Sequence, residues 1–307
     1  MSRIGLKWVA PVILSVACAA LAPTQPITAP LESDASSAFA YDRSAPFDLK
    51  EESVKEQEGV TIRDINYASR AQGQGRTQAY LITPKGKGPF AGVLFFHWLG
   101  EEKSDRTEFL EEATALAKQG TVSLLIQGFF PWKVAPIDGP TDRQRIIEQT
   151  IEVLRGLDLL LAQPGTDPKR IGYVGHDYGA MFGSIVSGFD RRVKAYVLMA
   201  ALGNFSDWSL KYWPRTAAKG EQAYRQAVTD LDPINYVSHA SPAAFLFQFA
   251  NTDKYISKAA AASLYEKANE PKQVKWYDAT HNLEVSAAHK DRDDWLTREL
   301  GLAKAMR

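Results

Sequence analysis

Three side chains of the kinds that perform nucleophilic and acid–base chemistry stand in separate loops of this chain. Asp177 lies within the run 175–179, GHDYG, while Asp253 and His281 each follow a later apolar run of β type. A carboxylate can attack carbon or direct a water molecule, and an imidazole can move a proton near neutral pH. We therefore take these three residues as the candidate catalytic set.

The run around Asp177 has the pattern of a sharp turn between a strand and a helix. The solid apolar stretch 171–174 precedes it, and Gly175 and Gly179 stand two positions away on each side. Small flanking residues permit a strained turn that lifts the central side chain above a sheet, and the following helix start points backbone N–H groups at it. A Gly-x-Asp-x-Gly string can also be an ordinary turn, but its position here favours a nucleophile elbow.

The elements that must position these side chains alternate along the chain. From about Gly59 onward, β-type runs alternate with helical patterns, which predicts an α/β fold with a mostly parallel sheet covered on both faces. We expect strands over 60–67 and 78–83, paired as an antiparallel hairpin, and then over 91–96, 122–126, 171–174, 195–199, 244–249 and 274–277. We expect helices over 108–118, 143–161, 180–188, 258–269 and 285–300.

Together these features resemble the α/β-hydrolase superfamily over roughly 61–300, and the overall plan is most similar to dienelactone hydrolase-like proteins. The elbow GHDYGA itself resembles the aspartate elbow of epoxide hydrolases and haloalkane dehalogenases. The order of nucleophile, acid and histidine is also that of the superfamily. The resemblance implies that Asp253 orients His281, and that backbone N–H groups of Leu99 and Tyr178 form an oxyanion hole.

An aspartate at the elbow indicates attack on a saturated carbon. Such a carboxylate displaces a halide or opens an epoxide, and water activated by His281 then splits the ester left on Asp177. Attack on a carboxylic ester would instead form an anhydride, which is far less favourable. Two alternatives stay open: a dienelactone hydrolase-like ester or lactone hydrolase in which Asp177 acts as a base, and a non-catalytic ligand-binding protein on the same fold.

An insertion rich in aromatic residues separates the strands that end near Ala200 and begin near Ala243. Residues 202–240 are expected to form a small cap over a pocket, because loops at the carboxyl ends of parallel strands bind ligands. Trp208, Tyr212 and Tyr224 are the candidate substrate-binding residues within it. Either tyrosine could protonate an opened epoxide. The alternative is that these rings only pack the insertion onto the body.

Two further candidates for the substrate site, His97 and Trp98, lie where the resemblance places the oxyanion loop. The simpler interpretation of His97 is a brace for that loop. Indole N–H groups of Trp98, Trp132 or Trp208 could hold a departing halide. We interpret the other histidines, at positions 176, 239 and 289, as structural, and the mixed-charge run 290–294 as a solvated helix face.

The composition restricts the partners of the chain. Lys and Arg number 36 against 36 Asp and Glu, so no net charge attracts nucleic acid or an anionic membrane, and a small-molecule substrate is the expected partner. No metal-ligand spacing, phosphate loop or dinucleotide fingerprint is present, so we expect no cofactor and no metal. Nothing in these patterns predicts the oligomeric state.

The N-terminal segment has the pattern of an export signal. Residues 1–22 carry two basic residues and then an apolar run that Pro11 interrupts, which predicts a signal peptide, a periplasmic or secreted location and no stable membrane insertion of the mature chain. Cys18, the single cysteine, lies in that run, and a weak lipoprotein box around it leaves lipid anchoring as an alternative. We expect a flexible spacer over 23–46 and the hydrolase domain over 47–307.

Overall fold

The computed structural model of the chain describes residues 1, 37–72, 74–100 and 104–303. Residues 2–22 of the expected signal peptide, with Cys18, and residues 23–36 of the expected spacer lie outside these ranges. No helix in the described ranges combines the length and the apolar character that crossing a bilayer requires.

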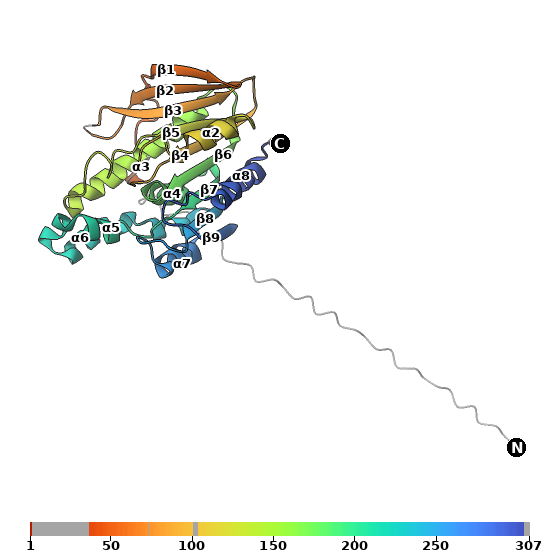
Figure 1. The fold of residues 1–307 in the computed structure, drawn as a ribbon. Coiled ribbons are helices and arrows are strands. Elements are labelled where there is room, and N and C mark those ends of the chain that lie inside the picture. Colours follow the sequence, from red (N-terminus) through yellow and green to blue (C-terminus); the bar gives the residue numbers. More distant parts are fainter. Residues whose placement is uncertain (2–36, 73, 101–103, 304–307) are drawn as a thin grey trace.

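A twisted sheet of nine strands forms the centre of the described chain, in the order β1-β2-β3-β5-β4-β6-β7-β8-β9 (Figure 1). Strands β1 to β3 and the β3–β5 pair are antiparallel, and all pairs from β5 across to β9 are parallel. The strands are β1 (Lys50–Gln57), β2 (Val60–Ala68), β3 (Arg76–Pro84), β4 (Phe90–Phe96), β5 (Thr121–Ile126), β6 (Thr166–His176), β7 (Val193–Met199), β8 (Ala244–Ala250) and β9 (Lys272–Tyr277).

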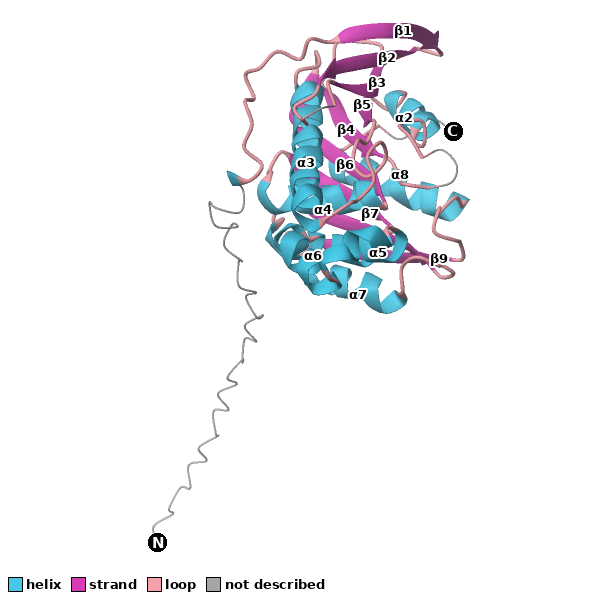
Figure 2. Ribbon diagram, turned by 90° about the vertical axis from the view of Figure 1, so that its left-hand side faces the viewer, coloured by secondary structure: helices cyan, strands magenta, loops and turns pink. Residues whose placement is uncertain are grey.

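Helices cover both faces of this sheet, which is why the central strands read as continuous apolar runs. Figure 2 shows α3 and α4 on one side of the sheet and α2 and α8 on the other. The helices are α2 (Leu110–Ala117), α3 (Gly139–Leu161), α4 (Tyr178–Phe189), α5 (Phe205–Tyr212), α6 (Glu221–Val228), α7 (Lys258–Lys267) and α8 (Ser286–Leu300). The α/β architecture predicted from the alternation of patterns is therefore confirmed.

Strand β1 was not expected from the sequence. Its eight residues, KEESVKEQ, are almost all exposed and have no alternating apolar face, so no periodicity marks them as a strand. The strand pairs only with β2 at the outer edge of the sheet. Its lysines and glutamates suit that position, because charged side chains on an edge strand oppose pairing with another molecule.

The expected flexible spacer ends earlier than Pro46. Phe39 is 2% exposed and stacks on Phe189, with the ring centroids 4.9 Å apart. The guanidinium of Arg155 donates hydrogen bonds to the backbone oxygens of Ala45 at 2.6 Å and Pro46 at 2.8 Å. Residues 37–46 therefore pack on the domain, because an apolar ring and two backbone carbonyls find partners there.

The mixed-charge run 290–294 is only partly the solvated face that its composition suggested. Lys290 and Asp294 form an ion pair with both side chains more than half exposed. Arg292, in contrast, is 1% exposed and donates to Glu112 on α2 and to Gln248. Arg292 differs from its neighbours because its guanidinium finds a carboxylate on α2 and an amide oxygen on β8.

Candidate active site

The backbone at Asp177 has the strained conformation of a nucleophile elbow. Asp177 joins β6 to α4 with φ 57° and ψ −119°, a region that residues other than glycine rarely adopt. A Cβ at Gly175 would lie 2.5 Å from the backbone oxygen of Gly179, and one at Gly179 would lie 2.1 Å from that of Phe96. Glycine is thus required on both sides for the turn to close over the sheet.

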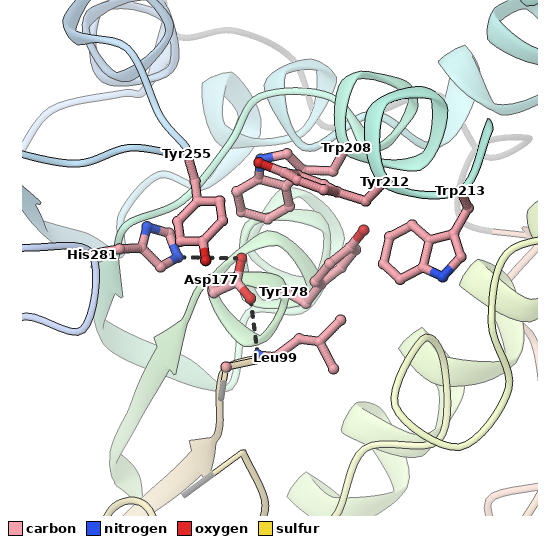
Figure 3. Close-up of a pocket in the computed structure, with 9 residues that line it drawn as sticks. Leu99, Asp177, Tyr178, Trp208, Tyr212, Trp213, Tyr255 and His281 are labelled. Carbon is pink, nitrogen blue, oxygen red and sulfur yellow. Dashed lines mark hydrogen bonds and ion pairs between the residues drawn. The ribbon is translucent and has the colours of Figure 1, made fainter. Parts of the chain in front are cut away.

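The carboxylate of Asp177 contacts one of the two backbone N–H groups that were expected to form an oxyanion hole. The backbone N–H of Leu99 donates to Oδ2 at 2.9 Å (Figure 3). Tyr178 is the first residue of α4, and the first N–H groups of a helix have no acceptor within the helix and lie at its positive end. One carboxylate oxygen is therefore held by the Leu99 N–H, and Oδ1 is directed toward His281.

His281 and Asp253 form a hydrogen-bonded pair beside the elbow. Nδ1 of His281 donates to Oδ2 of Asp253 at 2.7 Å, while Oδ1 of Asp253 accepts from the backbone N–H groups of Tyr255 at 2.7 Å and Ile256 at 3.0 Å. Nε2 of His281 lies 3.7 Å from Oδ1 of Asp177. Burial alone would raise the pKa of Asp253, but His281 and these N–H groups hold it below its usual value. The three candidate catalytic residues are thus brought together.

The charge of His281 is set by the two carboxylates that flank it. Burial alone would lower the pKa of His281, because it penalises the charged ring. The contacts with Asp177 and Asp253 outweigh that penalty and raise its pKa to about 9. At neutral pH the free site therefore holds an imidazolium between two carboxylates, and removing either negative charge lowers the pKa of the ring.

A mostly aromatic pocket of about 280 Å³ opens in front of Asp177 (Figure 3). Trp208 and Tyr212 come from α5 in the cap insertion, as expected, and no lysine or arginine is among the lining residues. In the described ranges, no group of three or more His, Cys, Asp or Glu side chains could hold a metal. The pocket is lined by Leu99, Gly100, Asp177, Tyr178, Trp208, Tyr212, Trp213, Tyr255 and His281.

Two residues expected at the substrate site have other roles. Tyr224 is buried, and its hydroxyl donates to Oδ2 of Asp142 on α3 at 2.8 Å, so it fastens the cap insertion to the body. His97 is buried too: its Nε2 accepts from the Gly128 N–H at 2.9 Å, and its Nδ1 donates to the backbone oxygen of Trp98 at 2.9 Å. Burial lowers the pKa of His97 to about 4, so this ring is a neutral brace.

The indole of Trp98 is also outside the pocket that faces Asp177. Its ring stacks parallel to that of His176, with the centroids 5.1 Å apart and an interplanar angle of 1°. Trp98 instead lines a smaller cavity on the far side of His281. Residue type and proximity in sequence suggested a substrate contact, but the ring instead packs on His176.

The three candidate indole donors differ in their hydrogen bonding. Nε1 of Trp132 donates to the backbone oxygen of Trp98 at 2.8 Å, so it is already used. Nε1 of Trp208 is buried and has no hydrogen-bond partner among the described residues. Because an unpaired buried donor is costly, a ligand atom that accepts from Trp208 would recover that cost.

Two aromatic lining residues, Tyr255 and Trp213, were not included in the predicted site. The ring of Tyr255 meets the His281 imidazole edge to face, with centroids 4.8 Å apart, and it also contacts Tyr212. Its position two residues after Asp253 is the signal that could have identified it. Trp213 directly follows Tyr212 at the carboxyl end of α5, and both rings line the pocket.

Comparison with known proteins gives matches of structure alone. No protein-family model and no curated protein sequence matches the chain. An acetyl xylan esterase from Paenibacillus has a TM-score of 0.67 at 16% identity, with 87% of this chain and 92% of that chain covered. Acetyl xylan esterase 1 from Thermoanaerobacterium has a TM-score of 0.67 at 14% identity, with 89% and 95% covered. An S-formylglutathione hydrolase from Agrobacterium tumefaciens has a TM-score of 0.62 at 16% identity, with 82% and 100% covered.

The chain has the α/β-hydrolase fold. In an α/β-hydrolase fold the nucleophile stands on the turn between a strand and a helix, followed along the chain by the acid and then the histidine. Asp177 follows β6, Asp253 follows β8 and His281 follows β9, all at carboxyl ends of parallel strands. The fold thus explains why residues more than a hundred positions apart in sequence meet in one site.

Proposed function

We propose that this chain is a hydrolase of a small, mostly apolar organic molecule, with Asp177, His281 and Asp253 as its catalytic residues. One observation carries the proposal: the Leu99 N–H holds Oδ2 of Asp177 at 2.9 Å while Oδ1 faces the pocket and His281. A carboxylate held in this way is oriented for attack, and the same N–H stabilises an oxyanion formed later on that oxygen.

The geometry supports a covalent mechanism on an epoxide or an alkyl halide. Oδ1 of Asp177 forms a bond to a saturated carbon as the carbon–halogen or carbon–oxygen bond breaks. A halide leaves with the electron pair, near the N–H of Trp208, whereas an epoxide oxygen takes a proton from the His281 imidazolium. The product of this step is an ester on Asp177.

Hydrolysis of that ester uses the change of charge at Asp177. Esterification removes one of the two carboxylates that keep His281 protonated, so the pKa of the ring falls and the neutral imidazole becomes available as a base. In the halide reaction its proton passes to solvent. His281 then takes a proton from water as the water oxygen bonds to Cγ of Asp177, Leu99 stabilises the oxyanion, and the alcohol leaves with that proton.

A second candidate is hydrolysis of an ester or lactone, and the structural comparisons favour it. The similar solved structures include acetyl xylan esterases and an S-formylglutathione hydrolase, all enzymes that cleave acyl groups by name. In this mechanism Asp177 takes a proton from water as the water oxygen bonds to the carbonyl carbon, so no anhydride forms. The acyl carbon–oxygen bond then breaks, and the alcohol leaves with a proton from the His281 imidazolium. The oxyanion hole would then have to exchange Oδ2 of Asp177 for the carbonyl oxygen of the substrate.

A single turnover in heavy-oxygen water separates the two mechanisms. An excess of the enzyme is mixed with an epoxide, an alkyl halide, an ester or a lactone. The mass of the peptide that contains Asp177 is then measured by mass spectrometry. The covalent mechanism puts one heavy oxygen into Asp177, and His281→Gln accumulates the alkyl ester as added mass on the same peptide. Product formation with unlabelled Asp177 would overturn the covalent mechanism and support direct attack by water.

We also propose that the protein acts after export, since residues 1–22 have the composition of a signal peptide. Fractionation of cells that express the full chain tests this expectation. The mature chain should be found in the periplasm or the medium, and its N-terminal sequence should begin after the apolar run. Retention of the intact chain in the cytoplasm would contradict the proposal.

A further inference from the structure

His176, the residue before Asp177 in the chain, contacts His281. Its ring is fully buried between the indole of Trp98, stacked at 5.1 Å, and the imidazole of His281, whose centroid is 5.6 Å away. Its Nε2 lies 2.9 Å from the backbone oxygen of His281, and its Nδ1 lies 2.6 Å from Oε1 of Glu108. Both ring nitrogens thus face oxygen atoms.

Hydrogen-bond chemistry restricts where the protons lie. A carbonyl oxygen only accepts, so Nε2 of His176 carries a proton and donates it to His281. Nδ1 of His176 lies 2.6 Å from Oε1 of Glu108. Two lone pairs facing each other at that distance would repel, so a further proton is shared between these two atoms. The Glu108–His176 pair is therefore a buried, proton-sharing link.

The other oxygen of Glu108 reaches the oxyanion loop. Oε2 accepts from the Trp98 backbone N–H at 2.8 Å, and the next N–H along the chain, that of Leu99, donates to Asp177. Glu108 and His176 thus connect the loop that carries the oxyanion donor to the loop that carries His281. The two ends of this chain of contacts are the groups on opposite sides of the Asp177 carboxylate.

We propose that Glu108 and His176 are positioning residues that hold the Leu99 N–H and the His281 ring in register with Asp177. This inference rests on the proposed function, because it takes Asp177 and His281 as the catalytic groups. Neither residue lines the pocket, so both act through others. Loss of the link should lower the rate of chemistry and leave substrate binding largely unchanged, since misplacement by about 1 Å can cost about a hundredfold in rate.

The test compares variants that break the link with variants that keep its hydrogen bonds. Glu108→Ala removes both contacts, whereas Glu108→Gln can accept from Trp98 and donate to a neutral His176. His176→Asn retains a group near Glu108 but loses the bond to His281, and His176→Gln retains a donor for the His281 carbonyl. Glu112→Ala, which removes a carboxylate that binds Arg292 and His289 on α8, is the control for general destabilisation.

Two readouts keep this proposal separate from the proposed function. Proton NMR of the full chain follows the low-field Nδ1 proton of His281, assigned by its loss in His281→Gln, and needs no substrate. We expect Glu108→Ala and His176→Asn to weaken or shift that signal and to lower kcat about tenfold to a hundredfold with KM within about threefold. Glu108→Gln and His176→Gln should restore most of both.

The outcomes are distinguishable. The positioning role would be overturned if the His281 proton signal shifted no more in Glu108→Ala and His176→Asn than in Glu112→Ala. It would also be overturned if Glu108→Gln were as defective as Glu108→Ala, or His176→Gln as defective as His176→Asn. If Glu108→Ala does not fold, the His176 pair decides alone. If no substrate class is turned over, the proposed function fails while the NMR comparison still decides the role of the link.

Discussion

Oδ1 of Asp177 stands 3.7 Å from Nε2 of His281, an ion-pair distance that is longer than a good hydrogen bond. Oδ2 of the same carboxylate is fixed by Leu99 at 2.9 Å. The two oxygens of Asp177 are therefore not equivalent: one is held by the backbone, and the other keeps its lone pairs available on the pocket side. This difference is the basis of the proposed chemistry.

Replacing Asp177 with Asn tests the charge of the nucleophile at nearly constant shape. We expect turnover to fall at least a thousandfold, because an amide is a poor nucleophile and a poor base. We also expect the pKa of His281 to fall below its value of about 9, since one of the two carboxylates that raise it is gone. NMR titration of His281 measures the second effect, and an unchanged midpoint would contradict the role assigned to Asp177 in setting that charge.

Trp208→Phe removes the buried, unpaired indole N–H of a residue that lines the pocket, and it keeps an aromatic ring. If the N–H stabilises the departing halide or oxygen, kcat should fall about tenfold or more, in line with a hydrogen bond to a charged group. Trp213→Phe, which also alters a lining ring, is the matched control and should change mainly KM. Equal effects of the two substitutions would show that Trp208 acts only through its shape.

Tyr224→Phe tests the attachment of the cap insertion to α3. The substitution leaves the buried Asp142 without the hydroxyl that donates to it at 2.8 Å, so the free energy of unfolding should fall by about 1–3 kcal/mol. Tyr212→Phe, in a half-exposed ring of the same insertion, should change stability by less than about 0.5 kcal/mol. Urea denaturation of both variants measures the difference. Equal losses of unfolding free energy in the two variants would contradict the role of Tyr224 in attaching the cap insertion to α3.

Two buried carboxyl groups make the stability of the cap region depend on pH. Burial raises the pKa of Asp142 to about 6 and that of Asp232, which accepts from the Phe205 N–H at 2.9 Å, to about 7. In the unfolded chain an aspartate has a pKa of about 3.9, so between this pKa and the folded-state values the folded chain binds more protons than the unfolded chain. The stability contributed by these groups is therefore complete below about pH 4 and is lost as the pH rises toward 7.

Asp232→Asn isolates this effect. The amide oxygen of Asn can still accept from the Phe205 N–H, but the amide group does not ionise. The Tm of the variant should therefore increase relative to that of the wild type as the pH rises from 4 to 7. Asp230→Asn, an exposed carboxylate in the same segment, controls for the loss of one negative charge. A difference in Tm that stays constant over this pH range would contradict the account.

The elements and the three candidate catalytic residues that meet in one site could be predicted because each has a local signature. Apolar runs and helical stripes mark the buried strands and helices, and the glycines around Asp177 mark the elbow because each would clash as any other residue. Strand β1 has no such signature, since its side chains are exposed and only pairing with β2 defines it. Local sequence patterns therefore predict buried strands and helices, and they miss an exposed strand that is defined only by pairing with its neighbour.

Side-chain roles within the cap insertion required the three-dimensional arrangement. Tyr212 and Tyr224 are chemically alike and lie on adjacent helices, yet one faces the pocket and the other binds Asp142. His176 and Glu108, 68 positions apart, form their contact only because the loop after β4 folds back over the end of β6. No spacing rule connects such residues, because the fold and not the sequence brings them to the same place.

The backbone conformation of Asp177 sets the stability of the protein against its proposed catalytic activity. A residue with a side chain at φ 57° costs on the order of 1–3 kcal/mol, which glycine would largely avoid. A selection for heat resistance alone would therefore favour glycine at this position and yield a more stable protein that lacks the proposed nucleophile. Improvement of this enzyme by random mutagenesis needs a screen for turnover at every round, because thermal survival by itself rewards the loss of Asp177.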